Sequence, residues 1–412
     1  MLVLGLNFFP EPTGISPYTS AMARGVFRSG LPTRVLTAHP HYPDWRIREG
    51  YGQWSRDEVV NDVQVRRLLH YVPGRPKGAR RLLSELTFGA RLVLSRWGSP
   101  DVIVAVSPAL FSTAVAAVRA KLSRRRVPFV VWVQDLYALG LSETGQGGGA
   151  TLRLIRAVEG ALLRRATRVV VIHDRFAARV RDDFAVDPQR IEVIRNWTHL
   201  APAPDIDVPA ARARFGWHED ETVVLHAGNM GVKQGLDNVV DAARLAAKRG
   251  ERVRFVLLGD GSEKGRLRAW AGDLPTIEFI PPLDDASFAQ ALAAADVLLV
   301  NELPGVAEMA VPSKLTSYFS VGRPVLAATD LAGITAEEVR AADAGAVVPA
   351  GDPAALLDGV IALRADAENA ARLGRNGRKY RDTVLDEGHA ISRWVALINS
   401  VALSNTHPSR PA

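Results

Sequence analysis

Short apolar runs alternate with amphipathic stretches along almost the whole chain. The apolar runs cover residues 2–6, 33–38, 63–69, 102–106, 129–135, 169–173, 191–195, 222–227, 254–259, 276–280, 297–300, 325–328 and 346–348. Stretches with helical periodicity separate most of them. Strands that are apolar throughout and alternate with helices are typical of parallel sheets covered on both faces. We therefore predict an α/β fold with a β-strand at each run.

A proline-rich segment, residues 201–210, interrupts this alternation and has no periodicity, as expected of a linker. We predict two Rossmann-like, doubly wound domains on either side of it, residues 1–200 and 201–385. The helical stretch 386–403 follows the second domain, and we expect it to pack back on the first. The polar residues 404–412 are expected to form a flexible tail.

Composition narrows the class of protein. The chain has 412 residues, of which 47% are hydrophobic and 23% charged, so each domain can bury a core. The absence of cysteine excludes a disulfide scaffold, a thiolate metal site and a cysteine nucleophile. Residues 1–200 hold 29 Lys and Arg against 16 Asp and Glu, a net charge of +13, and the remainder carries −6. A basic first half indicates an anionic partner, either nucleic acid or an anionic membrane surface.

The basic residues also form a local pattern. Residues 71–97 combine arginines with leucines in a stretch that can lie on an anionic membrane; the alternative is a core-packed helix with a solvated basic face. Few aromatic residues are interleaved with the basic ones, which disfavours a nucleic-acid partner. The longest uncharged run, residues 102–118, is broken by Ser107-Pro108, so we predict no membrane-spanning segment.

Ligands of doubly wound sheets bind beyond the carboxyl ends of the strands, so the loops after the strands are the candidate sites. The first such loop leads through Gly14 to Ser16, a predicted N-cap, and Pro17. A glycine there lets a ligand approach the N–H groups of the helix start, which favour anions. The G-x-G-x-x-G pattern is absent, which disfavours a dehydrogenase. Gln134 and Asp135 end the fifth run, where Asp135 either binds a hydroxyl, as an orienting group or base, or only caps the turn.

Two other loops contain residues that could bind a metal ion. His39, His41 and Asp44 follow the second run, but prolines stiffen this loop and no further ligand cluster lies near it in sequence. A rigid aromatic loop for an acceptor or lid is the favoured interpretation. Asp205 and Asp207 lie in the linker, away from any strand end, and are expected to be solvated. We expect no metal site.

The second half contains a stronger candidate for an anion site. The loop of residues 228–235 combines glycines with the side chains of Asn229, Lys233 and Gln234. A helix is predicted to begin near Gly235, so backbone donors, a helix dipole and a lysine would converge on one point, which suits a diphosphate. The order of a P-loop is absent. Gly259 and Gly261 follow the next run and form a second loop that allows close approach of backbone.

Residues 308–317 lead into another helix. Pro312 suits its first turn, which would also contain Ser313 and Lys314. A lysine at this end of a helix is unfavourable against the dipole and requires a negative partner. A ligand phosphate is the favoured partner, and Glu308 is the alternative.

Together these motifs resemble family 4 of the retaining glycosyltransferases with the GT-B fold, and are similar to the bacterial exopolysaccharide enzymes of the colanic-acid fucosyltransferase type. The matching pieces are Asn7…Pro10-Glu11-x-Thr13-Gly14-Ile15…Tyr18-Thr19, His41-Tyr42-Pro43-x-Trp45, Gln134-Asp135, Asn196-Trp197, Gly228-Asn229-x-Gly231-x-Lys233-Gln234-Gly235-Leu236, Leu258-Gly259-x-Gly261 and Val311-Pro312-Ser313-Lys314-Leu315-Thr316. They occur in the expected order over most of the chain.

The resemblance implies two Rossmann-like domains facing a cleft and a retaining hexosyltransferase of extracellular or capsular polysaccharide biosynthesis. A nucleotide-sugar donor, linked to GDP or UDP, would bind mainly to the second domain. The acceptor, a polyprenyl-diphosphate-linked saccharide, would bind mainly to the basic first domain. Such an enzyme would be cytoplasmic and peripheral on the inner face of the plasma membrane. No cofactor or metal is expected, because lysines and helix dipoles would stabilise the leaving diphosphate.

The resemblance also assigns roles to residues. The expected catalytic residues are Glu308, Lys314 and Asp135; the expected substrate-binding residues are Gly14, Gln134, Asn229, Lys233, Gln234, Gly259, Gly261, Ser313 and Ser317. Three positions depart from the family pattern. Asn229 and Gln234 stand where the family usually has Arg and Lys, and Ser317 stands at the second of two paired glutamates. A nucleotide-sugar epimerase of the same fold, or a non-catalytic nucleotide-sugar-binding protein, therefore remain alternatives.

Overall fold

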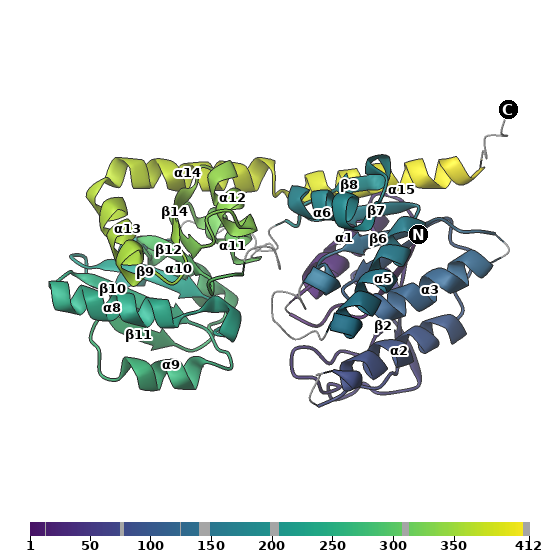
Figure 1. Cartoon of the computed structure of the whole chain (residues 1–412), viewed down its shortest axis with the longest axis horizontal. Coiled ribbons are helices and arrows are strands. Elements are labelled where there is room, and N and C mark those ends of the chain that lie inside the picture. The colour runs from purple at the N-terminus through teal and green to yellow at the C-terminus, as the bar shows by residue number, and fades with distance from the viewer. Residues whose placement is uncertain are drawn as a thin grey trace. The chain divides into compact units, whose positions relative to one another are not determined.

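The computed structural model describes residues 1–12, 14–74, 78–123, 125–139, 149–197, 206–306 and 313–406. The chain forms two compact units (Figure 1): unit 1 comprises Met1–Asn196 and Glu387–Ala412, and unit 2 comprises Trp197–Asp386. Side chains are described up to residue 403, without that of Ser313. The predicted domain boundary, between residues 200 and 201, lies outside the described residues.

Unit 1 is built on an eight-stranded sheet of order β3-β4-β2-β1-β5-β6-β7-β8. The strands are β1 (Leu2–Gly5), β2 (Arg34–Ala38), β3 (Ser55–Val60), β4 (Val63–Leu68), β5 (Ile103–Ser107), β6 (Phe129–Val133), β7 (Arg168–Val171) and β8 (Ile191–Val193). All pairs are parallel except β3 with β4. The apolar pattern predicted every strand but β3. This edge strand has the sequence Ser-Arg-Asp-Glu-Val-Val and only its last residue is buried, so it carries no continuous apolar run.

The helices of unit 1 are α1 (Ser16–Arg28), α2 (Ala79–Leu94), α3 (Leu110–Leu122), α5 (Gly149–Arg165), α6 (Asp174–Phe184), the 3₁₀ turn η1 (Pro188–Arg190) and α15 (Glu387–Thr406). The C-terminal helix α15, drawn in yellow, lies beside α1 and β6 in Figure 1. Its Trp394 is fully buried, with its ring 4.9 Å from that of Trp132 in β6. An ion pair joins Arg24 of α1 to Glu387. The helix continues to Thr406, past the predicted start of the tail at residue 404.

Unit 2 contains a six-stranded, all-parallel sheet of order β11-β10-β9-β12-β13-β14. Its strands are β9 (Thr222–Ala227), β10 (Val253–Leu258), β11 (Ile277–Ile280), β12 (Val297–Asn301), β13 (Val325–Thr329) and β14 (Gly345–Pro349). Its helices are α7 (Val208–Phe215), η2 (Val232–Gln234), α8 (Asp237–Arg249), α9 (Lys264–Ala271), α10 (Asp285–Ala294), α11 (Ser313–Val321), α12 (Ile334–Ala341), α13 (Pro353–Ala365) and α14 (Ala367–Thr383).

Each face of the unit 2 sheet packs into its own apolar core. Val223 and Leu225 of β9 belong to one core, and Val224 between them belongs to the other. Successive side chains of a strand point to opposite faces, so both faces of the sheet are covered. This confirms the predicted doubly wound architecture, and it explains why these strands read as continuous apolar runs.

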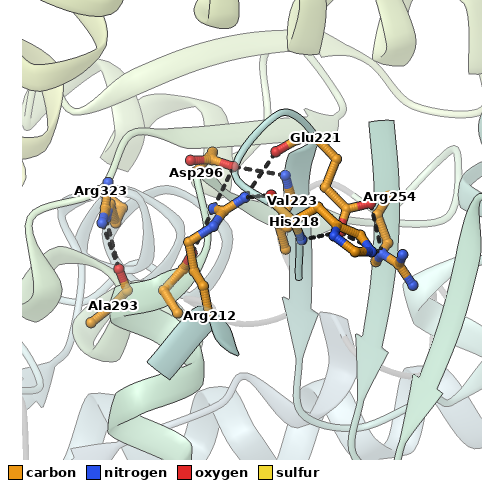
Figure 2. A network of polar contacts seen from close by, with 9 residues as sticks. Arg212, His218, Glu221, Val223, Arg254, Ala293, Asp296 and Arg323 are labelled. Atoms are coloured by element: carbon orange, nitrogen blue, oxygen red, sulfur yellow. Dashed lines mark hydrogen bonds and ion pairs between the residues drawn. The ribbon is translucent and has the colours of Figure 1, made fainter. Parts of the chain in front are cut away.

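A buried arginine fixes the start of unit 2 to the amino edge of its sheet (Figure 2). Arg212 of α7 donates hydrogen bonds to the carbonyls of Ala294, His218 and Glu221 and to the carboxylate of Asp296, at 2.6–3.1 Å. Asp296 also accepts from the backbone N–H of Val223, at 2.8 Å. These contacts hold α7 and the first residues of β9 and β12 together. The opposite, carboxyl edge of the sheet is left to the loops that the sequence identified.

Candidate active site

The strand order of unit 2 reverses between β9 and β12, and such a switch point is where ligands bind in this type of sheet. The two strands pair only at Val224 with Val297 and at Leu225 with Leu298, and they separate toward their carboxyl ends. The hydroxyl of Tyr318, from α11, enters the gap. It accepts a hydrogen bond from the N–H of Ala227 and donates one to the carbonyl of Leu299, which lies 3.2 Å away.

Two glycine loops interlock beside this gap. The N–H of Gly228 donates to the carbonyl of Leu258, and the N–H of Met230 donates to that of Asp260, both at 2.8 Å. At Gly259 (φ +135°) an added Cβ would lie 2.1 Å from the carbonyl oxygen of Gly228. At Gly261 (φ +158°) it would lie 2.4 Å from that of Met230. The close contact between the loops therefore requires glycine at both positions.

The loop of residues 228–235 presents free backbone donors. Among the described residues, the N–H groups of Asn229, Val232 and Lys233 have no hydrogen-bond acceptor. All three residues are exposed, and the Lys233 side chain forms no ion pair within the described part of the chain. Such a group of N–H donors beside a cation attracts anions.

Residues at and just after the end of β12 hold the loop of residues 228–235 in place. The side-chain amide of Asn301 donates to the carbonyls of Gln234 and Gly235, and the N–H of Leu303 donates to the carbonyl of Lys233. Gln234 accepts from the N–H of Gly231 through its Oε1, so its side chain supports the loop. The helix predicted to begin near Gly235 is preceded by η2 and begins at Asp237.

Lys314 reaches the same gap from the first turn of α11. Its Nζ lies 3.3 Å from Nε2 of His226, a fully buried residue of β9. Burial lowers the pKa of Lys314 to about 8, against the opposing charge of Glu302. Burial also raises the pKa of Glu302, although hydrogen bonds from Thr329 and Thr335 to its carboxyl group oppose this shift. A partly desolvated cation at a switch point is suited to bind an anion.

Sequence reasoning missed His226 and Glu302. Their signal was nevertheless present, because His226 is a polar residue within an apolar strand and Glu302 directly follows one. Glu308, the alternative to a ligand phosphate as negative partner of Lys314, lies outside the described residues, as do Pro312 and the side chain of Ser313. Ser317 is buried, and its carbonyl accepts from the hydroxyl of Ser320.

Unit 1 has its switch point between β1 and β5. Gly14 has a φ of +69°, and an added Cβ there would lie 3.4 Å from the ring of Tyr42. The helix α1 has Ile15 as its N-cap and begins at Ser16, whose hydroxyl is buried without a hydrogen-bond partner among the described residues. The predicted N-cap at Ser16 is therefore wrong by one position, because Pro17 occupies the second residue of the helix.

Carboxylates occupy the backbone donors at the strand ends of unit 1. Glu11 accepts from the N–H groups of His41 and Tyr42 and from the side chain of Asn7, at 2.8–2.9 Å. Glu159 accepts from the N–H groups of two residues that follow β6, Tyr137 and Ala138. Glu85 of α2 accepts from the N–H of Phe111 at the start of α3, and burial raises the pKa of Glu85 to about 7. All three glutamates are buried.

The predicted acceptor-side residues follow β6. Gln134 is buried and forms a reciprocal pair of amide hydrogen bonds with Asn196, at 2.8 and 3.3 Å. Asp135 is partly buried, and its carbonyl accepts from the hydroxyl of Ser107 at 3.4 Å. The structure thus places both residues at the carboxyl edge, with the Gln134 amide already paired.

The histidine loop after β2 packs as an aromatic cluster. The ring of His41 lies 5.1 Å from that of His70 and 5.7 Å from that of Trp45. Burial lowers the pKa of His70 to about 3, so this imidazole is neutral. Within the described residues, no group of three or more His, Cys, Asp or Glu side chains is arranged to hold a metal ion. The independence of metal stays a prediction.

The basic stretch of residues 71–97 contains α2, one side of which packs into the core while other residues are exposed. Its Phe88 and Leu92 are buried in the core, and its Leu82, Leu83 and Leu86 are exposed. No helix in the described part of the chain is both long and apolar enough to span a bilayer.

A cavity of about 510 Å³ opens in unit 2 at the opposite, amino edge of the sheet. Its lining mixes acidic side chains such as Asp296 with basic ones such as Arg323 and Arg375. None of the predicted site residues lines it, and its Asp296 side chain already pairs with Arg212. We therefore place the candidate site at the carboxyl edge, where free donors and Lys314 meet.

Comparisons with known proteins agree with this architecture. Residues 13–197 match the family described as glycosyl transferase 4-like domain, and residues 207–380 match glycosyl transferases group 1. The chain is similar to a putative colanic acid biosynthesis glycosyl transferase of Escherichia coli, with 34% identity over 336 residues, 78% of this chain and 81% of that protein. It is also 29% identical to a D-inositol 3-phosphate glycosyltransferase of Catenulispora acidiphila, over 94% of this chain and 90% of that protein.

Two solved structures share the fold. Sucrose-phosphate synthase from Thermosynechococcus elongatus has a TM-score of 0.77 at 19% identity, over 98% of this chain and 100% of that one. HepE from Anabaena, solved in complex with UDP and glucose, has a TM-score of 0.71 at 18% identity, over 97% of this chain and 100% of that one. With both halves matched by glycosyltransferase families and the Escherichia coli relative matched over most of its length, the chain belongs to the family 4-type glycosyltransferases of the GT-B fold.

Proposed function

We propose that the chain transfers a hexose, with retention of configuration, from a nucleotide-sugar to a polyprenyl-diphosphate-linked saccharide in extracellular polysaccharide synthesis. The observation that carries the proposal is the anion-binding character of the unit 2 switch point. There, three free backbone N–H groups, Lys233 and Lys314 surround the end of β9. The names of relatives supply the context: colanic acid synthesis for the Escherichia coli protein and bound UDP for HepE.

In this mechanism the bond between the sugar and the donor diphosphate breaks while the acceptor hydroxyl attacks the same face of the sugar, and the hydroxyl proton passes to an oxygen of the leaving diphosphate. Negative charge grows on the leaving phosphate, so the largest catalytic contribution comes from groups that stabilise an anion in place. Lys314, Lys233 and the N–H donors of loop 228–235 perform this task, and Glu308 holds sugar hydroxyls. Because these groups supply the positive charge, turnover should not depend on a divalent metal.

The acceptor is assigned to unit 1, where the Gly14 loop, Gln134 and Asp135 lie at the carboxyl edge. The helix α2 supports a lipid-linked acceptor, because three leucines on one stretch of it are exposed, beside the exposed Arg80 and the partly exposed Arg81. A basic residue near an anionic bilayer contributes about 1 kcal/mol to binding. The enzyme would then work at the cytoplasmic face of the plasma membrane as a peripheral protein.

The test is release of nucleoside diphosphate from a panel of GDP- and UDP-sugars, with and without extracted polyprenyl-diphosphate saccharides. Wild type would be compared with Glu308→Ala and Lys314→Ala, and with Lys248→Ala as a control, since Lys248 is exposed on α8. Acceptor-dependent release from one donor, lost in the two site variants and kept in the control, is the expected result.

Two other outcomes would replace the proposal. An altered sugar formed from the donor alone would identify an epimerase. Tight donor binding without turnover on any acceptor would identify a nucleotide-sugar-binding protein. Sensitivity of turnover to a chelator such as EDTA would contradict the metal-independent mechanism while leaving the transfer reaction in place.

A further inference from the structure

We propose that His226 is a positioning residue for Lys314: its imidazole accepts one N–H of the ammonium group and leaves the other two available to the donor diphosphate. The proposal rests on the proposed function, because it assumes that the unit 2 switch point binds the donor. It assigns a task to a buried histidine that the sequence did not single out.

The geometry of the contact determines its direction. An ammonium group has three donors and no acceptor, so at the 3.3 Å distance from Nζ the Nε2 atom of His226 must be the acceptor. In the opposite tautomer, Nε2–H would point at the cation, and the carbonyl of Asn229 lies 3.5 Å from Nε2. Burial and the charge of Lys314 lower the pKa of His226 well below its usual value, so the imidazole is neutral and keeps a free lone pair.

The other groups around Lys314 are already occupied. Glu302 supplies the opposing negative charge, and its two oxygens accept hydrogen bonds from the hydroxyls of Thr329 and Thr335. The negative charge of Asp330 repels that of Glu302. The hydroxyl of Tyr318, on the same helix as Lys314, is used between β9 and β12. Among the described residues, His226 is therefore the one hydrogen-bond partner of the Lys314 side chain.

This arrangement predicts how donor binding depends on pH. Burial lowers the pKa of Lys314 to about 8, so its charge is present below that pH and is lost as the pH rises through it. Removal of the acceptor on His226 would leave the ammonium less well solvated and would lower the pKa of Lys314 further. Affinity for a diphosphate should then fall at neutral pH, and the fall with rising pH should begin earlier.

The experiment is calorimetric titration of the purified chain with UDP and with GDP, from about pH 6 to about pH 9, a range that spans the lysine transition. His226→Gln keeps an acceptor near the position of Nε2, whereas His226→Leu removes it. Lys314→Met removes the lysine charge, so any change of affinity with pH that remains comes from the titration of the diphosphate itself. His218→Leu is a matched control, because His218 is exposed at the opposite edge of the unit 2 sheet.

As the pH rises through the lysine transition, we expect about a tenfold loss of diphosphate affinity in wild type, His226→Gln and His218→Leu. A factor of about ten corresponds to the lower end of the free energy of a charge-assisted contact. His226→Leu should bind about tenfold more weakly at neutral pH, with its transition at lower pH. Should the leucine variant fail to fold, His226→Asn offers the same comparison, because its shorter side chain withholds the acceptor.

Each remaining outcome is decisive. If His226→Leu follows the wild-type curve, or if His226→Gln is as weak as His226→Leu, His226 does not position Lys314 by accepting a hydrogen bond. If Lys314→Met binds both diphosphates as wild type does, the donor site itself is misplaced, and the proposed function fails with the inference. The two failures are therefore distinguished by the lysine variant.

Discussion

The two units end their strands in the same way but treat the backbone donors at those ends differently. In unit 1 the donors after β2 and β6 and at the start of α3 are taken by buried glutamates, Glu11, Glu159 and Glu85. In unit 2 the donors of Asn229, Val232 and Lys233 are free among the described residues, and Lys314 lies beside them. Internal carboxyl groups thus occupy in unit 1 the positions that a phosphate would occupy in unit 2.

This difference matters because strand ends and helix starts attract anions in any doubly wound domain. A domain that fills these positions with its own carboxylates gains stability and loses an anion site. A domain that leaves them open keeps binding capacity at the expense of stability. Removal of a carboxylate that accepts several hydrogen bonds, such as Glu11, should therefore destabilise unit 1, whereas removal of a lysine in unit 2 should reduce binding and turnover.

The largest expected effect is a loss of stability in the variant Glu11→Ala. Its carboxylate accepts from two backbone N–H groups and the Asn7 amide, and all of them would lose their partner inside the protein. Breaking such a buried charged contact costs about 3–5 kcal/mol. Urea unfolding should show this loss, and Glu11→Gln, which keeps one acceptor, should lose less. A cost below about 1 kcal/mol would mean that water replaces the carboxylate and that the unit 1 network is not closed.

The next effect concerns Glu85 and depends on pH. Its pKa is raised to about 7 in the folded protein from 4.5, so the folded state favours the protonated form. Stability is therefore lost as pH rises between these two values, by up to about 3 kcal/mol above pH 7. Glu85→Gln, which stays neutral, should remove this loss and raise the free energy of unfolding at about pH 8. Parallel pH curves for the variant and wild type would show that Glu85 is not desolvated.

Lys314→Ala should affect turnover and not stability: we expect a large loss of turnover and little change in the free energy of unfolding. A charge-assisted contact contributes about 1.5–3 kcal/mol, or roughly 10- to 150-fold in rate. Because the burial of this cation is itself unfavourable, the free energy of unfolding should be unchanged or slightly higher in the variant. Turnover and urea unfolding measured on the same preparation separate the two effects. A loss of turnover under about threefold would remove Lys314 from the site.

The sequence predicted the loops of the candidate site in unit 2 far better than the buried glutamates of unit 1. Glycines and lysines after apolar runs marked the loops of unit 2, because strand ends can be read from hydrophobic periodicity. Glu11, Glu85 and Glu159 gave no comparable signal: Glu85 sits between leucines and serine in a basic helix, and only folding brings it to the N–H of Phe111. His226 stands out as a polar residue within an apolar strand, but its contact with Lys314 could not be predicted, since Lys314 is 88 residues away along the chain. The strand β3 was missed because an exposed edge strand need not be apolar.

The smallest effect separates the two lysines of unit 2. Lys233 is exposed and forms no ion pair in the described part of the chain, so water competes for its charge and its contact with a diphosphate is worth about 0.5–1 kcal/mol. Lys233→Ala should weaken binding of UDP or GDP by about two- to fivefold, and the loss should shrink at high salt because exposed charges are screened. Lys248→Ala, an exposed lysine on α8, should change nothing at either salt concentration. If Lys233→Ala instead equals Lys314→Ala in size and is insensitive to salt, Lys233 becomes desolvated when the diphosphate binds. The loop of residues 228–235 would then have to close over the ligand, and the open donors of unit 2 would be a property of the free protein alone.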